Sequence, residues 1–379
     1  MSVPLTEGSA LQRQVPTSRA EVAGIESGES FASELIQWQR SHGRNKLPWQ
    51  NTRDPYRVWL SEIMLQQTQV ATVLGYYERF LQRFPDVAAL AAAPLDDVLS
   101  MWSGLGYYAR GRNLHSCAQA VVARHGGVFP PSSAVLAELP GIGRTTAAAI
   151  AAFCFGERVA ILDGNVKRVL TRVLAFDGDL ASASAERDLW AMATSMLPAE
   201  GEGIESYTQG VMDLGATICT QRAPQCLLCP VNQRCAALRT GQPERYPVKT
   251  RKLKRSRREN DWLLLQWRGK LWLTQRPPTG IWAALWSLPE FEDVRDVAAG
   301  WPGTVERQDS VVHVLTHLDW LLKPVVWTLP DDADSVQVDK VLASLPAGRW
   351  VTSQEALTLG LPAPLRRLIE RQPEMQAER

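Results

Sequence analysis

Four of the chain's six cysteines lie between residues 219 and 235, and this cluster constrains the fold more than any other feature. They are separated by six, two and five residues, and they are Cys219, Cys226, Cys229 and Cys235. A disulfide framework is not expected, because the other cysteines stand apart and the N-terminal residues resemble no secretory signal. Four thiolates this close together can surround one compact inorganic centre. The segment 219–235 is therefore predicted to be a metal-ordered loop.

The cysteine spacing favours an iron–sulfur cluster over zinc and leaves both open. Structural zinc usually takes two cysteine pairs separated by a longer loop, whereas only Cys226 and Cys229 form such a pair here. A single wrapped loop suits a cubane [4Fe–4S] cluster better. A redox-active Cys-x-x-Cys motif is a third interpretation, but it would leave Cys219 and Cys235 without a role. The metal is predicted to be structural, which would place Arg222 of the loop near a phosphate.

Composition and charge exclude several classes of protein. The 379 residues are 45% hydrophobic and 21% charged, which is ordinary for a globular chain and excludes disorder throughout. No stretch approaches the roughly 18 uninterrupted apolar residues of a membrane span. The formal net charge of +1 neither indicates nor excludes nucleic acid, because clustering of charge on one face matters more than the total. A chain of this length is expected to form two or three domains.

The first part of the chain has a helical pattern. Residues 1–30 carry several glutamates and no apolar core, so we expect a disordered tail and a cytoplasmic protein of bacterial type, associated with the nucleoid. From residue 31 to residue 244, apolar residues recur every three or four positions between short Gly/Pro turns. The clearest helices are predicted at 107–124, 145–155, 165–175 and 185–197. This pattern predicts an all-α domain of many short helices.

A basic segment separates this domain from a second one. Residues 245–258 contain many bases and no acid, so they are predicted to be an exposed linker, either a solubilising connector or a strap that follows DNA phosphates. Residues 259–372 have a strand-like pattern, with a hairpin predicted over 262–274. A helix at 361–371 is predicted to close this α+β domain. Residues 373–379 are expected to form a C-terminal tail.

Two carboxylates are candidate catalytic groups. Glu62 is the one acid in an apolar helical stretch, and apolar surroundings raise the pKa of a carboxyl so that it can serve as a general acid. Asp163 precedes a glycine at a predicted helix start, where a capping role is the commoner interpretation. Together they resemble the carboxylate pairs of glycoside hydrolysis, in which one group protonates the leaving group and the other stabilises an oxocarbenium-like centre. Cleavage of an N-glycosidic bond needs the same division of labour.

The segment Leu139–Ala147 is predicted to be a tight turn between two helices. Gly141 and Gly143 let the backbone turn sharply and approach a partner closely. The N–H groups at the start of the following helix would then face a phosphate oxygen. Such contacts position a protein on DNA without reading its sequence. An ordinary helix-turn-helix corner is the alternative for this motif taken alone.

Several strings together carry a resemblance to a known family; they are "SEIMLQQTQV", "GLGYYARGRNL", "LPGIGRTTA", "LDGNVKRV" and the cysteine spacing. The chain resembles, from about residue 31 to residue 370, the helix-hairpin-helix DNA glycosylases with an iron–sulfur loop, which include endonuclease III and the MutY-type adenine DNA glycosylases. The resemblance implies a [4Fe–4S] cluster. Segments 280–290 and 313–320 resemble the Nudix-related domain of adenine glycosylases, which reads 8-oxoguanine. No cluster of glutamates typical of a Nudix hydrolase is present, so no pyrophosphatase activity is expected.

The resemblance implies a monofunctional adenine glycosylase that excises adenine opposite 8-oxoguanine or guanine in duplex DNA. Endonuclease III-like enzymes have a nucleophilic lysine two residues after the second glycine of the turn, and this chain has Thr145, which cannot form a Schiff base. Lys167 is an alternative amine, although a lysine facing phosphate is the commoner interpretation. Glu62 would protonate adenine N7 and then activate water. Asp163 would stabilise the oxocarbenium ion.

The same resemblance implies the contacts with DNA. Gln67 and Tyr107 would fill the stack vacated by the flipped adenine, and Gln209 would hydrogen-bond the adenine edge. Thr316 keeps the hydroxyl that would bond the oxidised base, while Leu315 replaces the family's aromatic residue. Trp49 and Leu65 would line the adenine pocket. The other residues expected to contact substrate or DNA are Gln50, Thr68, Leu105, Gly106, Gly141, Gly143, Thr145, Asn165 and His317.

Two other functions stay open at this point. The first is an endonuclease III-like glycosylase and lyase for oxidised pyrimidines, against which Thr145 and the C-terminal domain both argue. The second is a non-catalytic binder of DNA lesions, against which the presence of both carboxylates argues. The protein is expected to act as a monomer without a membrane partner, and the sequence indicates no particular protein partner.

Overall fold

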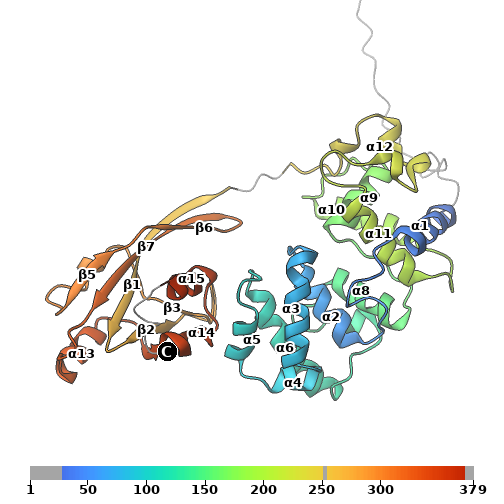
Figure 1. Ribbon diagram of the computed structural model, residues 1–379. Helices are drawn as coiled ribbons and strands as arrows, with labels where there is room; N and C mark the ends of the chain where they lie inside the picture. The colour runs from blue at the N-terminus through green and yellow to red at the C-terminus, as the bar shows by residue number, and fades with distance from the viewer. Residues whose placement is uncertain (1–27, 251–253, 372–379) are drawn as a thin grey trace, which may run out of the picture. The chain divides into compact units, whose positions relative to one another are not determined.

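The computed structural model describes residues 28–250 and 254–371, and their contacts divide the chain into two compact units (Figure 1). The first unit combines the residues up to Arg44 with Leu162–Val248. The second combines Asn45–Ile161 with the residues from Lys249 onward. The expected tails at 1–30 and 373–379 lie outside the described residues, except for 28–30, which belong to the first helix. No helix of the described parts is both long and apolar enough to span a bilayer.

The first unit is a helical bundle that ends in short turns. Its elements are α1 (Gly28–His42), α9 (Gly164–Val173), α10 (Ala183–Ser195), α11 (Ile204–Thr217), η1 (Cys226–Leu228), η2 (Asn232–Arg234), α12 (Ala236–Arg239) and η3 (Pro243–Arg245). Helices α1 and α11 pack closely at Gly210, where an added Cβ would lie 3.0 Å from the Leu35 side chain. The N-terminal helix of the chain is therefore anchored by a segment far along the sequence.

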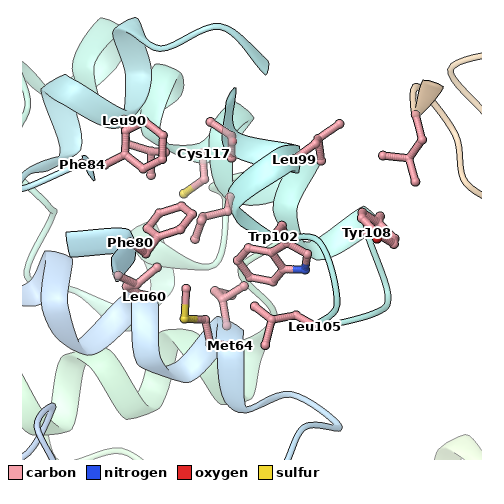
Figure 2. Packing of buried hydrophobic residues seen from close by; sticks show 14 of the residues in the cluster. Leu60, Met64, Phe80, Phe84, Leu90, Leu99, Trp102, Leu105, Tyr108 and Cys117 are labelled. Carbon is pink, nitrogen blue, oxygen red and sulfur yellow. The ribbon is translucent and has the colours of Figure 1, made fainter. Parts of the chain in front are cut away.

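The helical part of the second unit surrounds an aromatic core. Its helices are α2 (Pro55–Leu65), α3 (Val70–Arg83), α4 (Val87–Ala92), α5 (Leu95–Met101), α6 (Ala109–His125), α7 (Ser133–Leu136) and α8 (Arg144–Phe155). Helix α2 begins at a proline, whose fixed φ suits the first helical position, and Asp54 caps it by accepting the Tyr56 N–H. Figure 2 shows Leu60 and Met64 of α2 beside Phe80 and Trp102, all buried. This packing fixes the helix that carries Glu62.

The C-terminal part of the second unit is a mixed sheet with helices on both faces. Its strands are β1 (Ser256–Trp267), β2 (Lys270–Gln275), β3 (Trp286–Ser287), β4 (Glu290–Phe291), β5 (Thr304–Arg307), β6 (Val311–Val314), β7 (Leu318–Thr328) and β8 (Gly348–Thr352). The order β3-β2-β1-β7-β5 places β1 at the centre, parallel to β7 and antiparallel to β2. The middle of β1, residues 260–265, is buried on both faces, which explains its short continuous apolar run.

Three longer helices and one short turn complete this sheet domain. They are η4 (Val294–Asp296), α13 (Ser335–Leu342), α14 (Ser353–Leu357) and α15 (Ala363–Arg371). Alternate residues of β1 enter two different cores: Leu264 packs in the cluster that contains Leu365 of α15, and Leu263 in the cluster that contains Val338 of α13. The domain is therefore a sheet enclosed between α13 and α15.

The predicted fold class is confirmed. The predicted helices at 107–124, 145–155, 165–175 and 185–197 are α6, α8, α9 and α10. The predicted hairpin joins β1 to β2 through Arg268 and Gly269, which both have positive φ, at 48° and 68°. This geometry is typical of the type I′ turn that matches the twist of a hairpin.

The structure also shows where the basic segment 245–258 enters the fold. Strand β1 already begins at Ser256, and residues 251–253 lie outside the described part of the chain. Arg257 pairs with Glu259 at 3.0 Å, and Arg258 pairs with Glu290 at 3.2 Å. These two arginines therefore belong to the sheet and are engaged by its own acids.

Within the second unit, the sheet domain is attached to the helical part by hydrogen bonds and shared core. The buried Tyr108 hydroxyl donates to the Leu361 carbonyl at 2.8 Å, and Arg112 Nη1 donates to the Ala283 carbonyl at 2.8 Å. One continuous hydrophobic cluster includes residues of both parts. The segment around Tyr108 is thus fixed by contacts with the helical part and with the sheet domain.

Candidate functional site

Glu62 lies half-buried on α2, surrounded by core residues of the same helix. Burial raises the pKa of the Cys154 thiol on α8 to about 12, with smaller contributions from the negative charges of Asp54 and Glu62. The Glu62 carboxylate is thus within electrostatic reach of α8, the helix that follows the glycine turn.

Asp163 caps the first turn of α9 and lies half-buried. Its Oδ1 accepts the Val166 N–H at 2.6 Å, so the capping role is present. Burial raises the pKa of the Asp163 carboxyl above its ordinary value, although the backbone N–H groups of Val166 and Asn165, then Arg168, act in the opposite direction. Glu62 belongs to the second unit and Asp163 to the first, so the structure fixes the surroundings of each carboxylate separately.

No free amine stands at either expected position for a nucleophile. Thr145 lies half-buried in the first turn of α8 and carries only a hydroxyl. Lys167 on α9 is paired with Glu186, with its Nζ 2.5 Å from the carboxylate Oε1. The Lys167 side chain is therefore engaged by the carboxylate of the same unit.

The glycine turn before α8 is open to a partner. Gly141 has a φ of 73°, and a Cβ there would lie 2.5 Å from the Asn113 Cβ. Gly143 is the N-cap of α8 and makes no side-chain cap bond, and a Cβ there would meet nothing within 4 Å. The space beside Gly143 is therefore open at the start of α8, and the start of a helix is where backbone N–H groups bind phosphate in many proteins.

Two exposed residues have a left-handed backbone conformation. One follows the end of α2, and the other precedes the start of α6. Gln67 has a φ of 54°, and Tyr107 has a φ of 47° and is 49% exposed. The Tyr107 Oη lies 3.1 Å from the Thr316 Oγ1, on the turn between β6 and β7. The structure therefore brings together two predicted site residues that are far apart in the sequence.

Leu315 and His317, the other residues of the β6–β7 turn, make contacts that stabilise the turn. The Leu315 N–H donates to the Leu318 carbonyl at 2.8 Å, and the Leu315 side chain packs against the core. The His317 carbonyl accepts the Ser256 N–H at 2.9 Å, which ties the turn to the start of β1. Thr316 is held between these two anchors.

Beside the residues predicted to line the adenine pocket, Trp49 and Leu65, the predicted contact residue Gln50 carries an unusual buried amide. Trp49 is 8% exposed and packs edge-on against Tyr77, with ring centroids 5.3 Å apart. Gln50 Oε1 accepts the Leu47 N–H at 3.0 Å, but its Nε2 is buried and has no hydrogen-bond partner among the described residues. Leu65 ends α2 and packs against the core. A buried donor without a partner is rare in folded proteins and requires an explanation.

Gln209 is held by a buried network that sequence reasoning did not find. Its Nε2 donates to Asp213 Oδ1 at 2.9 Å, and Asp213 is fully buried. Arg44 donates to the same carboxylate through its backbone N–H and through Nε at 2.7 Å. Because a carboxylate only accepts, the Gln209 Oε1 stays available as an acceptor. The four-residue helical spacing between Gln209 and Asp213 was the available signal.

Asn165 lies beside Asp163 on α9 and is engaged within the fold. Its Oδ1 accepts from Arg168 Nη2 at 2.9 Å. Gly215 of α11 packs against it so closely that a Cβ would lie 2.7 Å from the Asn165 Cβ. Among the other predicted contact residues, Leu105 is buried in the core and Thr68 is half-buried.

All four clustered cysteines line one hollow of the first unit. The hollow encloses about 400 Å³, part of it open to solvent, and its other walls are mainly apolar. They include Val169, Val173, Leu214, Ile218, Val231 and Leu238. Within the described ranges, no three acidic, histidine or cysteine side chains converge on the position of a single metal ion. Burial raises the pKa of the Cys229 thiol to about 12.

A buried arginine completes this hollow. Arg172 is 1% exposed and donates to the Cys219 sulfur at 3.4 Å and to the Thr220 carbonyl at 2.7 Å. A buried guanidinium needs hydrogen-bond acceptors or an opposite charge, and ligated thiolates would add negative charge beside the carbonyls that Arg172 already binds. The donor set, the apolar walls and this cation fit a thiolate-bound metal cluster.

The fold and these sites define a class of protein. Residues 60–193 match the family described as HhH-GPD superfamily base excision DNA repair protein, and residues 261–371 match the NUDIX domain. A solved structure of a thermostable thymine-DNA glycosylase matches with a TM-score of 0.51 and 27% identity, covering 57% of this chain and 99% of that one.

Relatives that are adenine DNA glycosylases identify the family within this class. An adenine DNA glycosylase of Buchnera aphidicola subsp. Acyrthosiphon pisum is 33% identical over 347 residues, which cover 90% of this chain and 97% of that protein. An adenine DNA glycosylase of Homo sapiens is 30% identical, covering 89% of this chain and 73% of that protein. The chain belongs to the adenine DNA glycosylase family.

Proposed function

We propose that this protein removes adenine from duplex DNA in which adenine is paired with 8-oxoguanine or guanine, by hydrolysis of the N-glycosidic bond. The observation that carries the proposal is the 3.1 Å contact between Tyr107 and Thr316. An enzyme that flips one base must fill the vacated stack and recognise the base left behind. The exposed Tyr107 ring suits the first task and the Thr316 hydroxyl the second. Their proximity supports the assignment of both tasks to neighbouring residues.

Glu62 and Asp163 supply the chemistry in this proposal. Glu62 protonates adenine N7, which makes the base a better leaving group, and the resulting carboxylate then activates water. Proton transfer by a positioned group contributes roughly 10²–10⁴-fold. Asp163 stabilises the oxocarbenium ion by its negative charge. Thr145 and the paired Lys167 offer no free amine, so the reaction ends at an abasic site with an intact strand.

In this proposal, each of two amides makes one hydrogen bond with the flipped adenine. The unpartnered Nε2 of Gln50 is a donor for a ring nitrogen of the base. The Oε1 of Gln209, fixed as an acceptor by Asp213, suits the exocyclic amino group of adenine. Guanine presents a carbonyl oxygen at the corresponding position, so two acceptors would meet. This arrangement favours adenine by pairing and disfavours guanine by repulsion.

Cys219, Cys226, Cys229 and Cys235 would hold a [4Fe–4S] cluster in the hollow that they line. Bound there, the cluster orders a loop that has few apolar residues of its own. Arg168 and Arg172 of α9 reach the first cysteine, through its carbonyl and its sulfur respectively. The helix capped by Asp163 is therefore connected directly to the loop.

Incision assays with labelled duplexes test this function. The cluster-replete protein is incubated with adenine opposite 8-oxoguanine, with cytosine opposite 8-oxoguanine and with thymine glycol opposite adenine, and half of each sample then receives hot alkali. Cleavage at adenine only, and only after alkali, is the expected result. Nicking at thymine glycol without alkali would indicate a pyrimidine-specific lyase. Tight mismatch binding without base release would indicate a lesion binder.

A further inference from the structure

Arg110 is a buried cation with an unusual number of backbone partners. It lies in the first turn of α6, is 9% exposed and donates from both terminal nitrogens. Nη1 reaches the carbonyls of Ile63 at 2.9 Å, Met64 at 2.9 Å and Gln66 at 2.6 Å. Nη2 reaches the Thr68 Oγ1 at 3.0 Å and the carbonyls of Leu105 at 3.1 Å and Gly106 at 3.2 Å. One guanidinium thus joins the end of α2 to the loop before α6.

Each of these two segments carries an exposed residue in left-handed backbone. Gln67 stands between two residues that Arg110 binds, and Tyr107 follows a third. A non-glycine residue in this conformation costs of order 1–3 kcal/mol and persists only where its surroundings impose it. The Arg110 guanidinium also lies 5.6 Å from the centre of the Tyr107 ring. The hydrogen bonds of Arg110 supply the constraint that both conformations need.

We propose that Arg110 is a positioning residue, which holds Gln67 and Tyr107 in register with each other and with the helix that carries Glu62. This inference rests on the proposed function, because it assumes that Gln67 and Tyr107 enter the DNA stack. Arg110 itself is buried and acts through the two loops.

Lysine cannot replace Arg110 in this role. A guanidinium is a planar fork of five N–H donors, and Arg110 uses the four on its terminal nitrogens, whereas its buried Nε has no hydrogen-bond partner among the described residues. An ammonium group is a compact charge with three donors. A lysine at position 110 would keep the charge near the carbonyls at the end of α2 and lose the simultaneous reach to both loops. Misplacing a group by about 1 Å can cost roughly 100-fold in rate. The Arg110→Lys substitution therefore keeps the positive charge and removes the simultaneous hydrogen bonds to both loops, so it tests the positioning role by itself.

The test compares Arg110→Lys with Arg112→Lys, a matched control on the same helix. Arg112 donates to the Ala283 carbonyl and to neither loop. Each protein binds a duplex with 8-oxoguanine opposite 2′-fluoroadenosine, whose glycosidic bond resists cleavage, and 2-aminopurine beside the 8-oxoguanine reports unstacking by fluorescence. Single-turnover excision of ordinary adenine, cluster absorbance and affinity for undamaged duplex are measured in parallel.

We expect Arg110→Lys to keep its cluster absorbance and its affinity for undamaged duplex within about twofold. The fluorescence increase should be lost and single-turnover excision should fall at least about tenfold, while Arg112→Lys resembles the wild type. Normal fluorescence and excision for Arg110→Lys, or equal losses in both variants, would overturn the proposal.

A second variant covers the case in which Arg110→Lys does not fold. Thr68→Val removes one of the six hydrogen bonds with little change of shape, and it should reduce the fluorescence increase. An unchanged signal for Thr68→Val would then overturn the proposal. If the wild type unstacks the probe but excises no adenine, the proposed function fails, whereas the comparison of the variants still decides the role of Arg110.

Discussion

Replacing Asp163 with asparagine separates its two roles, because the structure shows one of them directly. The Asp163 Oδ1 caps α9 by accepting the Val166 N–H at 2.6 Å. Asparagine caps a helix about as well as aspartate, whereas alanine costs about 1 kcal/mol. Asp163→Asn therefore keeps the cap and removes the charge, and Asp163→Ala removes both. The pair of variants distinguishes a helix-entry residue from an electrostatic one.

The sign of the stability change follows from the raised pKa of Asp163. An unfolded aspartate ionises near pH 3.9, so from there up to the raised folded pKa the unfolded state binds fewer protons. Stability from this group is therefore lost as pH rises through that window. Asparagine carries no charge, so Asp163→Asn should be at least as stable as the wild type at pH 7. The difference should disappear towards acid pH.

Adenine excision, unlike stability, should decrease in both variants. Removing one preorganised electrostatic stabiliser typically lowers the rate by about 10²–10³-fold, so both variants should lose at least that much in single-turnover adenine excision. Thermal melts and excision rates measured on the same preparations form the assay. Excision by Asp163→Asn within tenfold of the wild type would refute the electrostatic role. A lower melting temperature for Asp163→Asn than for Asp163→Ala would refute the capping account.

Four further substitutions probe other parts of the site. Gln50→Leu removes the unpartnered Nε2 donor, so kcat/KM for adenine excision should fall about tenfold, as for one lost hydrogen bond; the melting temperature should also fall slightly, because the Leu47 N–H loses its acceptor. Gly141→Ala introduces a Cβ clash at positive φ and should cost about 1–3 kcal/mol in denaturant unfolding, whereas Gly143→Ala, which points into open space, should be tolerated. Thr316→Val removes the partner of Tyr107, so the preference for 8-oxoguanine over guanine in excision rates should decrease, and an unchanged ratio would contradict that role.

Features with a local signal could be predicted from the sequence. The helices α6, α8, α9 and α10 follow from apolar spacing, and the hairpin of β1 and β2 follows from the Arg268–Gly269 turn. The cysteines were predicted to meet because they are close in the chain, and they line one hollow. Each of these features depends on residues within about 20 positions of one another.

Features that depend on distant partners could not be predicted. The acceptors of Arg110 come from residues 63 to 106, and Arg44 meets Asp213 across most of the first unit. Strands β3 and β4 contain two residues each and exist because β2 and β1 pair with them. A buried arginine has no periodicity that would distinguish it from an exposed one on the same helix. Tertiary contact alone gives these residues their roles.

The most direct test of the account is single-turnover excision by Glu62→Gln on a duplex with adenine opposite 8-oxoguanine. Glutamine keeps the size and polarity of the side chain on α2 but cannot donate a proton as an acid does. The account predicts that the variant binds the mismatched duplex as the wild type does and releases adenine at least about 100-fold more slowly. Near-normal excision by Glu62→Gln at saturating enzyme would contradict the assignment of Glu62 as the general acid.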